Sequence, residues 1–95
     1  MRKITKESVY AFMENLPYKN SNTEVNPTNG NTGLYLHDNM IAFKVGDKIE
    51  VSLAGWNTNT TRDRLNGIPG VRIHTCKGVP FLNGNPINDT DWYTI

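Results

Sequence analysis

The side chains best suited to covalent chemistry or metal binding are two histidines, His37 and His74, and a single cysteine, Cys76. A thiol becomes a strong nucleophile when an imidazole lies within hydrogen-bonding reach and removes its proton. His74 and Cys76 are two residues apart in a strand-like segment, so both project from one face with the wrong direction of approach. A zinc site usually needs three or four ligands at recognisable spacing, which the sequence lacks. We therefore predict no catalytic residue, no metal ion and no cofactor, and we expect an inert thiol.

The acidic residues offer a second kind of chemistry, which is cation binding or general acid–base catalysis. Asp89 and Asp91 alternate near the end of the sequence, as such a pair could. Acidic residues in turns are normally only solvated, and neither glycine-rich motif that cradles nucleotide phosphates is present. We therefore predict that the protein is not an enzyme. The remaining enzymatic alternative is a small nuclease or hydrolase whose metal-dependent activity depends on Asp89, Asp91, His37 or His74.

Cationic and aromatic side chains form a third group of candidates. Arg62 and Arg64 lie in a central segment that reads as a short helix. Clustered cations and stacking rings are what single-stranded nucleic acids bind. The further residues that could contribute to such a surface are Tyr35, Lys44, Lys48, Arg72 and Lys77. The simpler interpretation, which we favour, is that Arg62 and Arg64 point to solvent from a helix whose other side buries Leu65.

The two tryptophans are the candidates for contact with a protein. A Gly-Trp step at the end of a strand, such as Gly55-Trp56, more often anchors a corner of the core than a binding site. Trp92 is harder to assign to a core by pattern, which favours an exposed aromatic patch of the kind that anchors protein interfaces. We predict that Trp56, Arg62, Arg64 and Trp92 form a partner-binding site.

Length and composition indicate one small domain spanning residues 1–95. Only 37% of the residues are hydrophobic, so we expect the core to depend on a few large side chains. The candidates are Phe12, Phe43, Trp56, Phe81 and Trp92. A net charge of +1 gives no global attraction to nucleic acid or to an anionic membrane. With no apolar run of signal-peptide or membrane-spanning length, we expect a soluble intracellular protein without a membrane partner.

The N-terminal segment has the pattern of an amphipathic helix. Its apolar face would be formed by four residues at helical spacing, namely Val9, Phe12, Met13 and Leu16. Thr5 is the expected N-cap, and Pro17 disfavours helical geometry at Leu16. In the central segment, Thr60 with Asp63 resembles a capping box, and Gly67 followed by Pro69 should end the helix. Both helices should cover a sheet.

Alternation of apolar and polar residues predicts the strands. Three segments, 34–37, 40–44 and 49–53, are separated by tight turns and should form an antiparallel meander. Within 40–44 either Met40 and Ala42 or Ile41 and Phe43 face the core, and we favour the bulkier pair, Ile41 and Phe43. Further strands are expected at 23–26, 71–75, 79–82 and 92–95. The predicted fold is α+β, with an N-terminal helix and a short central helix packed on a twisted, mainly antiparallel sheet of about five to six strands.

The central segment and its flanks also resemble a known group of proteins. The residues that carry the resemblance are Ala54 to Gly67, with Met1 to Phe12, Tyr35-Leu36-His37, Leu82-Asn83-Gly84 and Trp92. As a set they resemble small, largely uncharacterised accessory proteins of tailed bacteriophages, over nearly the whole chain. One departure is Pro80-Phe81, which stands where an aromatic pair is expected before Leu-Asn-Gly, so a binding surface there could differ.

The resemblance implies an accessory protein made in the cytoplasm of an infected bacterium. Such proteins commonly bind and disable a host or defence-system component, and the resemblance brings no catalytic residue with it. Our leading hypothesis is therefore a non-enzymatic phage protein that acts through protein–protein contact. The alternative is an RNA-binding or single-stranded nucleic-acid-binding protein, whose affinity would fall steeply with added salt.

Overall fold

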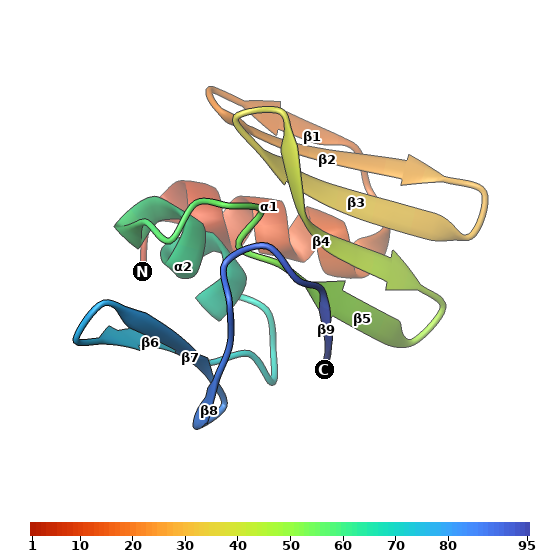
Figure 1. The fold of residues 1–95 in the computed structure, drawn as a ribbon. Coiled ribbons are helices and arrows are strands. Elements are labelled where there is room, and N and C mark those ends of the chain that lie inside the picture. Colours follow the sequence, from red (N-terminus) through yellow and green to blue (C-terminus); the bar gives the residue numbers. More distant parts are fainter.

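The computed structural model describes all residues from 1 to 95 and contains two helices and nine strands (Figure 1). In chain order they are α1 (Lys3–Glu14), β1 (Tyr18–Asn20), β2 (Thr23–Thr28), β3 (Asn31–Leu36), β4 (Asn39–Val45), β5 (Lys48–Val51), α2 (Asn59–Asn66), β6 (Ile73–Cys76), β7 (Val79–Leu82), β8 (Asn85–Pro86) and β9 (Tyr93–Thr94). The predicted α+β class is confirmed, with an N-terminal helix, a short central helix and antiparallel strands.

The strands belong to two sheets. A six-stranded antiparallel sheet has the order β1-β2-β3-β4-β5-β9, and β6, β7 and β8 form a separate three-stranded sheet. Of the strands after α2, only β9 joins the larger sheet, whereas we expected one sheet. The carboxamide of Asn66 explains the difference, because it donates to the carbonyl oxygen of Ile73 (2.9 Å) and accepts from the Ile73 N–H (2.6 Å). Asn66 thus bonds the backbone of β6 as a neighbouring strand would and holds β6 at the end of α2.

The core lies between the two helices and one face of the larger sheet, along which α1 runs (Figure 1). Phe12 from α1, Leu34 from β3 and Leu65 from α2 are fully buried there. Phe12 is the only aromatic residue of the core cluster, and Trp56 and Trp92 are exposed. The expectation of a core built on five large aromatic side chains is therefore wrong. Branched aliphatic side chains fill most of it.

Strand β4 contains a β-bulge that reverses part of its predicted orientation. Met40 and Ala42 pair with adjacent residues of β3, so Ile41 is an extra residue in the ladder. Ile41 is therefore buried next to Ala42, and Phe43 is half-buried on the opposite face. The prediction that Ile41 and Phe43 both face the core is correct for Ile41 and wrong for Phe43.

Helix α1 begins and ends earlier than its pattern predicts. Arg2 is its N-cap and makes no side-chain capping bond, while Thr5, the predicted cap, is a buried residue inside the helix. The helix ends at Glu14, where Asn15 adopts a left-handed conformation with φ 57°. Leu16 consequently lies beyond the helix and is exposed. Neither α1 nor α2 is long and apolar enough to cross a membrane.

Helix α2 is capped by Thr58 and not by the predicted Thr60. The hydroxyl oxygen of Thr58 accepts from the Thr61 N–H at 3.2 Å, so the helix begins before the predicted pair of Thr60 and Asp63. Its predicted end at Gly67 is confirmed. A Cβ atom on Gly67 would lie 2.8 Å from the Cγ2 atom of buried Thr5 and 2.8 Å from that of Val9, so only glycine lets α2 approach α1 this closely.

We expect Gly67→Ala to lower the free energy of unfolding by about 1–3 kcal/mol, the usual cost of overpacking a filled core. The φ of Gly67 is −73°, so backbone strain does not contribute. Urea unfolding measures the change. The matched variant is Thr5→Ser, which removes the clashing methyl group and keeps the hydroxyl, and it should recover part of the loss in the double variant. Strict additivity of the two changes would contradict the close contact.

Tyr18 gives the fold a pH dependence at high pH. The hydroxyl of this half-buried residue donates to Oε1 of Glu7 at 3.0 Å and joins β1 to α1. Burial is the largest cause that raises the pKa of Tyr18 above its ordinary value of 10.0, and the hydrogen bond and charge of Glu7 raise it further. The hydrogen bond with Asn20 lowers it and offsets part of the effect.

The unfolded chain therefore loses the Tyr18 proton before the folded protein does, so this residue's contribution to stability is complete below the ordinary pKa and is lost as the pH rises through the raised one. Urea unfolding between about pH 8 and pH 11 should show a steeper loss for the wild type than for Tyr18→Phe. Tyr10→Phe, at an exposed position on α1, is the control and should follow the wild type. Equal slopes for all three proteins would refute the assignment.

Candidate functional site

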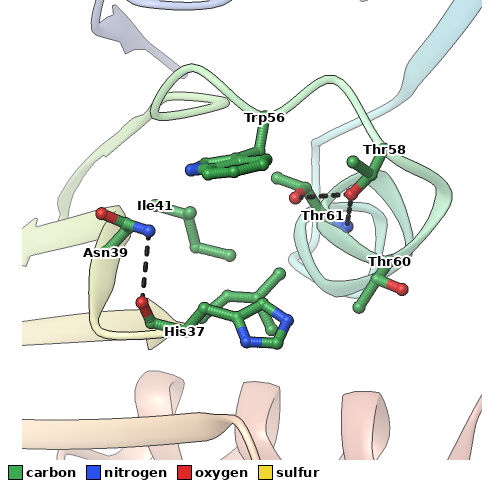
Figure 2. Close-up of a pocket in the computed structure, with 8 residues that line it drawn as sticks. His37, Asn39, Ile41, Trp56, Thr58, Thr60 and Thr61 are labelled. Atoms are coloured by element: carbon green, nitrogen blue, oxygen red, sulfur yellow. Dashed lines mark hydrogen bonds between the residues drawn. The ribbon is translucent and has the colours of Figure 1, made fainter.

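A pocket of about 540 Å³ opens between the β3–β4 hairpin and the start of α2 (Figure 2). This volume lies in the range of about 300–1,000 Å³ that small-molecule sites occupy. We call it the indole pocket, and its lining residues are Leu36, His37, Asn39, Ile41, Trp56, Thr58, Thr60 and Thr61. None of the eight carries a carboxylate, an ammonium or a guanidinium group.

The β3–β4 turn places His37 in the wall of this pocket. His37 and Asp38 have φ angles of 50° and 64°, the left-handed pair that a two-residue hairpin turn requires. The His37 N–H donates to the carbonyl oxygen of Asn22 at 2.8 Å, and the Asn22 side chain lies 3.3 Å from Nε2 of the imidazole. On the other side of the turn, Asn39 donates its amide to the His37 carbonyl oxygen at 3.2 Å. Several bonds thus hold a backbone geometry that is unfavourable for a side-chain-bearing residue.

A second left-handed turn places Trp56. Ala54 and Gly55 have φ angles of 54° and 83°, and the Trp56 N–H donates back to the carbonyl oxygen of Leu53 at 2.8 Å. This turn directs the indole away from the core, which leaves Trp56 58% exposed. Figure 2 shows the indole edge-on, with a flat face toward Ile41 and the His37 imidazole on the far side of the hollow. The expectation that Trp56 anchors a corner of the core is therefore wrong.

The largest departure from the sequence analysis is Arg64, which is 2% exposed instead of pointing to solvent. Its guanidinium donates to the hydroxyl oxygens of Thr5 on α1 (2.6 Å) and Thr23 on β2 (3.1 Å). It also lies 3.4 Å from a carboxylate oxygen of Asp63, which accepts from the Thr5 hydroxyl. Burial and then the charge of Arg2 lower the pKa of Arg64, and Asp63 opposes both effects. Arg64 is thus a structural residue and cannot contact a partner directly.

The Arg64 network reaches the indole pocket through side chains. Thr23, which accepts from Arg64, donates its own hydroxyl to the side-chain oxygen of Asn22 at 2.9 Å. Asn22 in turn contacts the imidazole of His37. A continuous path of hydrogen bonds therefore connects the buried guanidinium to the pocket wall.

A second hollow lies on the face of the larger sheet opposite α1. It measures about 380 Å³ and is lined by Met40, Phe43, Glu50 and Trp92. The bulge in β4 shapes it, because Ile41 and Ala42 both face the core and leave Met40 and Phe43 on the outer face. Trp92 is 43% exposed at its edge. We call this surface the Trp92 face.

The structure disperses the remaining predicted site residues. Arg62 is half-exposed and donates to the side-chain oxygens of Asn57 and Asn59. Lys48, beside the β4–β5 turn, and Lys77, in the β6–β7 turn, lie at opposite ends of the molecule (Figure 1). Arg72 is exposed just before β6.

Lys44 is buried instead of lying on a surface that a nucleic acid could reach. Its Nζ donates to the carbonyl oxygen of Met13 at 2.7 Å and lies 5.8 Å from the centre of the Phe12 ring. A cation in this position stabilises the C-terminal end of α1. Tyr35 projects from the outer face of β3, where its ring covers Gly33. The five residues proposed for nucleic acid therefore do not form one patch.

The residues considered for catalysis also lie apart from the two hollows, with the exception of His37. His74 stacks on Phe81 with ring centres 5.2 Å apart, and Cys76 is exposed. Asp91 accepts from the Asn88 side chain within a polar turn that also contains Asp89. No three His, Cys, Asp or Glu side chains gather in a group that could hold a metal ion.

Some pocket residues were missed or misassigned by sequence reasoning. Met40 is considered only as an alternative core residue and Phe43 is predicted to face the core, because a bulge cannot be read from alternation alone. Asn39 and Thr58 were not singled out. The signal that could have found this region is His37-Asp38 between two strand-like runs, since a two-residue turn there must expose both side chains.

These features define a small α+β protein in which two of the surface hollows are each bordered by an exposed tryptophan. A family model described as Kyanoviridae Gp96 protein matches residues 1–94. The chain therefore belongs to the Kyanoviridae Gp96 family, a family of phage proteins, which confirms the predicted phage origin. No curated protein and no solved structure matches the chain.

We expect Arg64→Met to lower the free energy of unfolding by about 2–4 kcal/mol, because Asp63 and two threonine hydroxyls lose a charged partner. Methionine keeps much of the apolar volume, so the loss reports on the polar network. Arg62→Met is the matched control on the same helix and should change stability by less than about 1 kcal/mol, as for exposed ion pairs and hydrogen bonds. Chemical denaturation measures both. Equal losses of stability in the two variants would show that the buried hydrogen bonds of Arg64 contribute no more than the exposed ones of Arg62.

Proposed function

We propose that the protein is a non-enzymatic phage accessory protein that binds and modulates or inhibits a host or defence-system protein. The observation that carries the proposal is the Trp92 face. Large apolar side chains on an open sheet face, next to a half-exposed tryptophan, have the composition of the anchor points of protein interfaces. Membership of a phage protein family supports synthesis in the infected host, where such a partner would be met.

The contact we propose is centred on Trp92, Phe43 and Met40. Tyr35 extends the same outer face, and Glu50 supplies a carboxylate at the edge of the hollow. A matching partner would insert an apolar side chain into the hollow and offer a cation to Glu50. Trp56 and Arg62 were predicted to share this contact. Trp56 lines the indole pocket instead, and Arg62 bonds to Asn57 next to Trp56.

Affinity capture from lysate of infected bacteria tests the proposal. The tagged wild type should retain a defined protein that Trp92→Ala retains at least about 30-fold more weakly, as expected when a hot-spot residue worth about 2 kcal/mol is lost. Tyr10→Ala is the matched control, because it removes an exposed aromatic side chain from α1, and it should capture the partner normally.

Each capture is repeated after nuclease treatment. Retention that disappears with nuclease would favour the alternative, an RNA-binding or single-stranded nucleic-acid-binding protein, and would refute the protein contact. The proposal would also fail if Trp92→Ala, folded as judged by its urea midpoint, captured the same partner as strongly as the wild type.

A further inference from the structure

We propose that the indole pocket binds an uncharged, planar heteroaromatic ring of the nucleobase type. This inference is independent of the protein contact at the Trp92 face, because the two hollows share no lining residue. It rests on three properties of the indole pocket, which are its charge, its shape and the rigidity of the residues that form it.

The charge of the lining limits the ligand. The wall contains an indole, an imidazole, a carboxamide, three hydroxyls and two aliphatic side chains. A phosphate or carboxylate inside the pocket would lose water without gaining a cation, which is costly. The ring itself must therefore be neutral, and any charged substituent must lie outside.

The shape of the lining favours a flat ring with polar edges. Figure 2 shows a flat face of the Trp56 indole over one side of the hollow, while the imidazole of His37, on the opposite side, presents an edge to it. Asn39 and Ile41 form one flank, and Thr58, Thr60 and Thr61 form the other (Figure 2). An aromatic face against one side of a ring, with imidazole, amide and hydroxyl groups around its edge, is how proteins recognise unstacked bases.

Polar atoms remain for hydrogen bonds at the edge of the ring. Asn39 uses one hydrogen of its side-chain amide for the His37 carbonyl oxygen, so the other can donate to an acceptor atom of the ring. The imidazole meets Asn22 through one nitrogen, and the other is left for a ligand. An aromatic side chain of a partner protein would use few of these groups, which is why we favour a nucleobase.

The site is built before any ligand arrives. His37 lies in a left-handed turn, and Trp56 directly follows one. Several hydrogen bonds hold each turn. Rigid placement lowers the entropy cost of binding. At the rim, Arg2 donates to the Thr60 hydroxyl at 3.3 Å, so a cation lies beside the pocket and is available to a phosphate outside it.

The two tryptophans allow a direct test, because each can be made the only one. Trp92→Phe reports on Trp56 through its fluorescence, and Trp56→Phe reports on Trp92. Titration with adenosine, cytidine and adenosine 5′-monophosphate should quench Trp56 saturably, with a Kd of about 1 mM or tighter, and leave Trp92 unaffected. The ratio of the Kd for adenosine to the Kd for adenosine 5′-monophosphate measures how much the phosphate gains from Arg2.

A pocket variant makes the test specific. In the Trp92→Phe background, His37→Asn removes the imidazole while asparagine tolerates the left-handed turn, and it should weaken binding about tenfold, the loss of one hydrogen bond to the edge of the base. Asp38→Asn changes the same turn at a residue outside the pocket and should bind like its parent. Loss in both variants would mean that the turn, and not the imidazole, is responsible, and would overturn the assignment.

Other outcomes would also overturn the proposal. N-acetyltryptophanamide binding as tightly as the nucleosides would identify the pocket as a groove for protein aromatic side chains. Equal quenching of Trp56 and Trp92 would indicate non-specific collisions. Absence of saturable quenching with any of the three nucleobase ligands would show that the pocket does not bind this chemical class.

Discussion

The guanidinium of Arg64 is the interaction on which the arrangement of the elements depends. It reaches α1 through Thr5 and β2 through Thr23, while its own backbone belongs to α2. A cation buried this deeply must have its donors satisfied, since an unpaired charge in the interior costs several kcal/mol, on the order of 3–5. No buried side-chain polar atom in the protein lacks a hydrogen-bond partner. The position of α2 relative to α1 and β2 is therefore fixed by directional bonds as well as by packing.

The same network gives the surface its rigidity. Thr23 and Asn22 continue the hydrogen bonds outward to His37, so the wall of the indole pocket is tied to the centre of the fold. Lys44 plays a comparable part at the other end of α1, where it bonds the Met13 carbonyl oxygen. Arg64 and Lys44 were both predicted as binding residues. Inside this small protein they instead join helices to strands. With a core in which Phe12 is the only aromatic residue, such polar joints replace some of the missing apolar contacts.

Local patterns in the sequence predict the elements well and their contacts less well. The helix over the N-terminal segment, the end of α2 at Gly67 and the strands predicted at 34–37, 40–44 and 79–82 follow from periodicity and turn chemistry. The burial of Arg64 does not, because the threonines that receive it are about 40 and 60 residues away in the chain. The bulge at Ile41 and the carboxamide of Asn66 likewise act through partners that alternation cannot reveal. Both tryptophans were recognised as important, but their division between two hollows depends on that bulge.

The edges of the larger sheet carry a consequence for the behaviour of the protein in a crowded cell. Its outermost strands, β1 and β9, contain only three and two residues. Short edges offer few free backbone groups for the addition of a foreign strand, which is the first step of fibril growth. The molecule can therefore display an apolar sheet face without polymerising through its borders. Resistance to aggregation through the sheet edges therefore follows from strand length. It leaves the apolar sheet face available for contact with a partner.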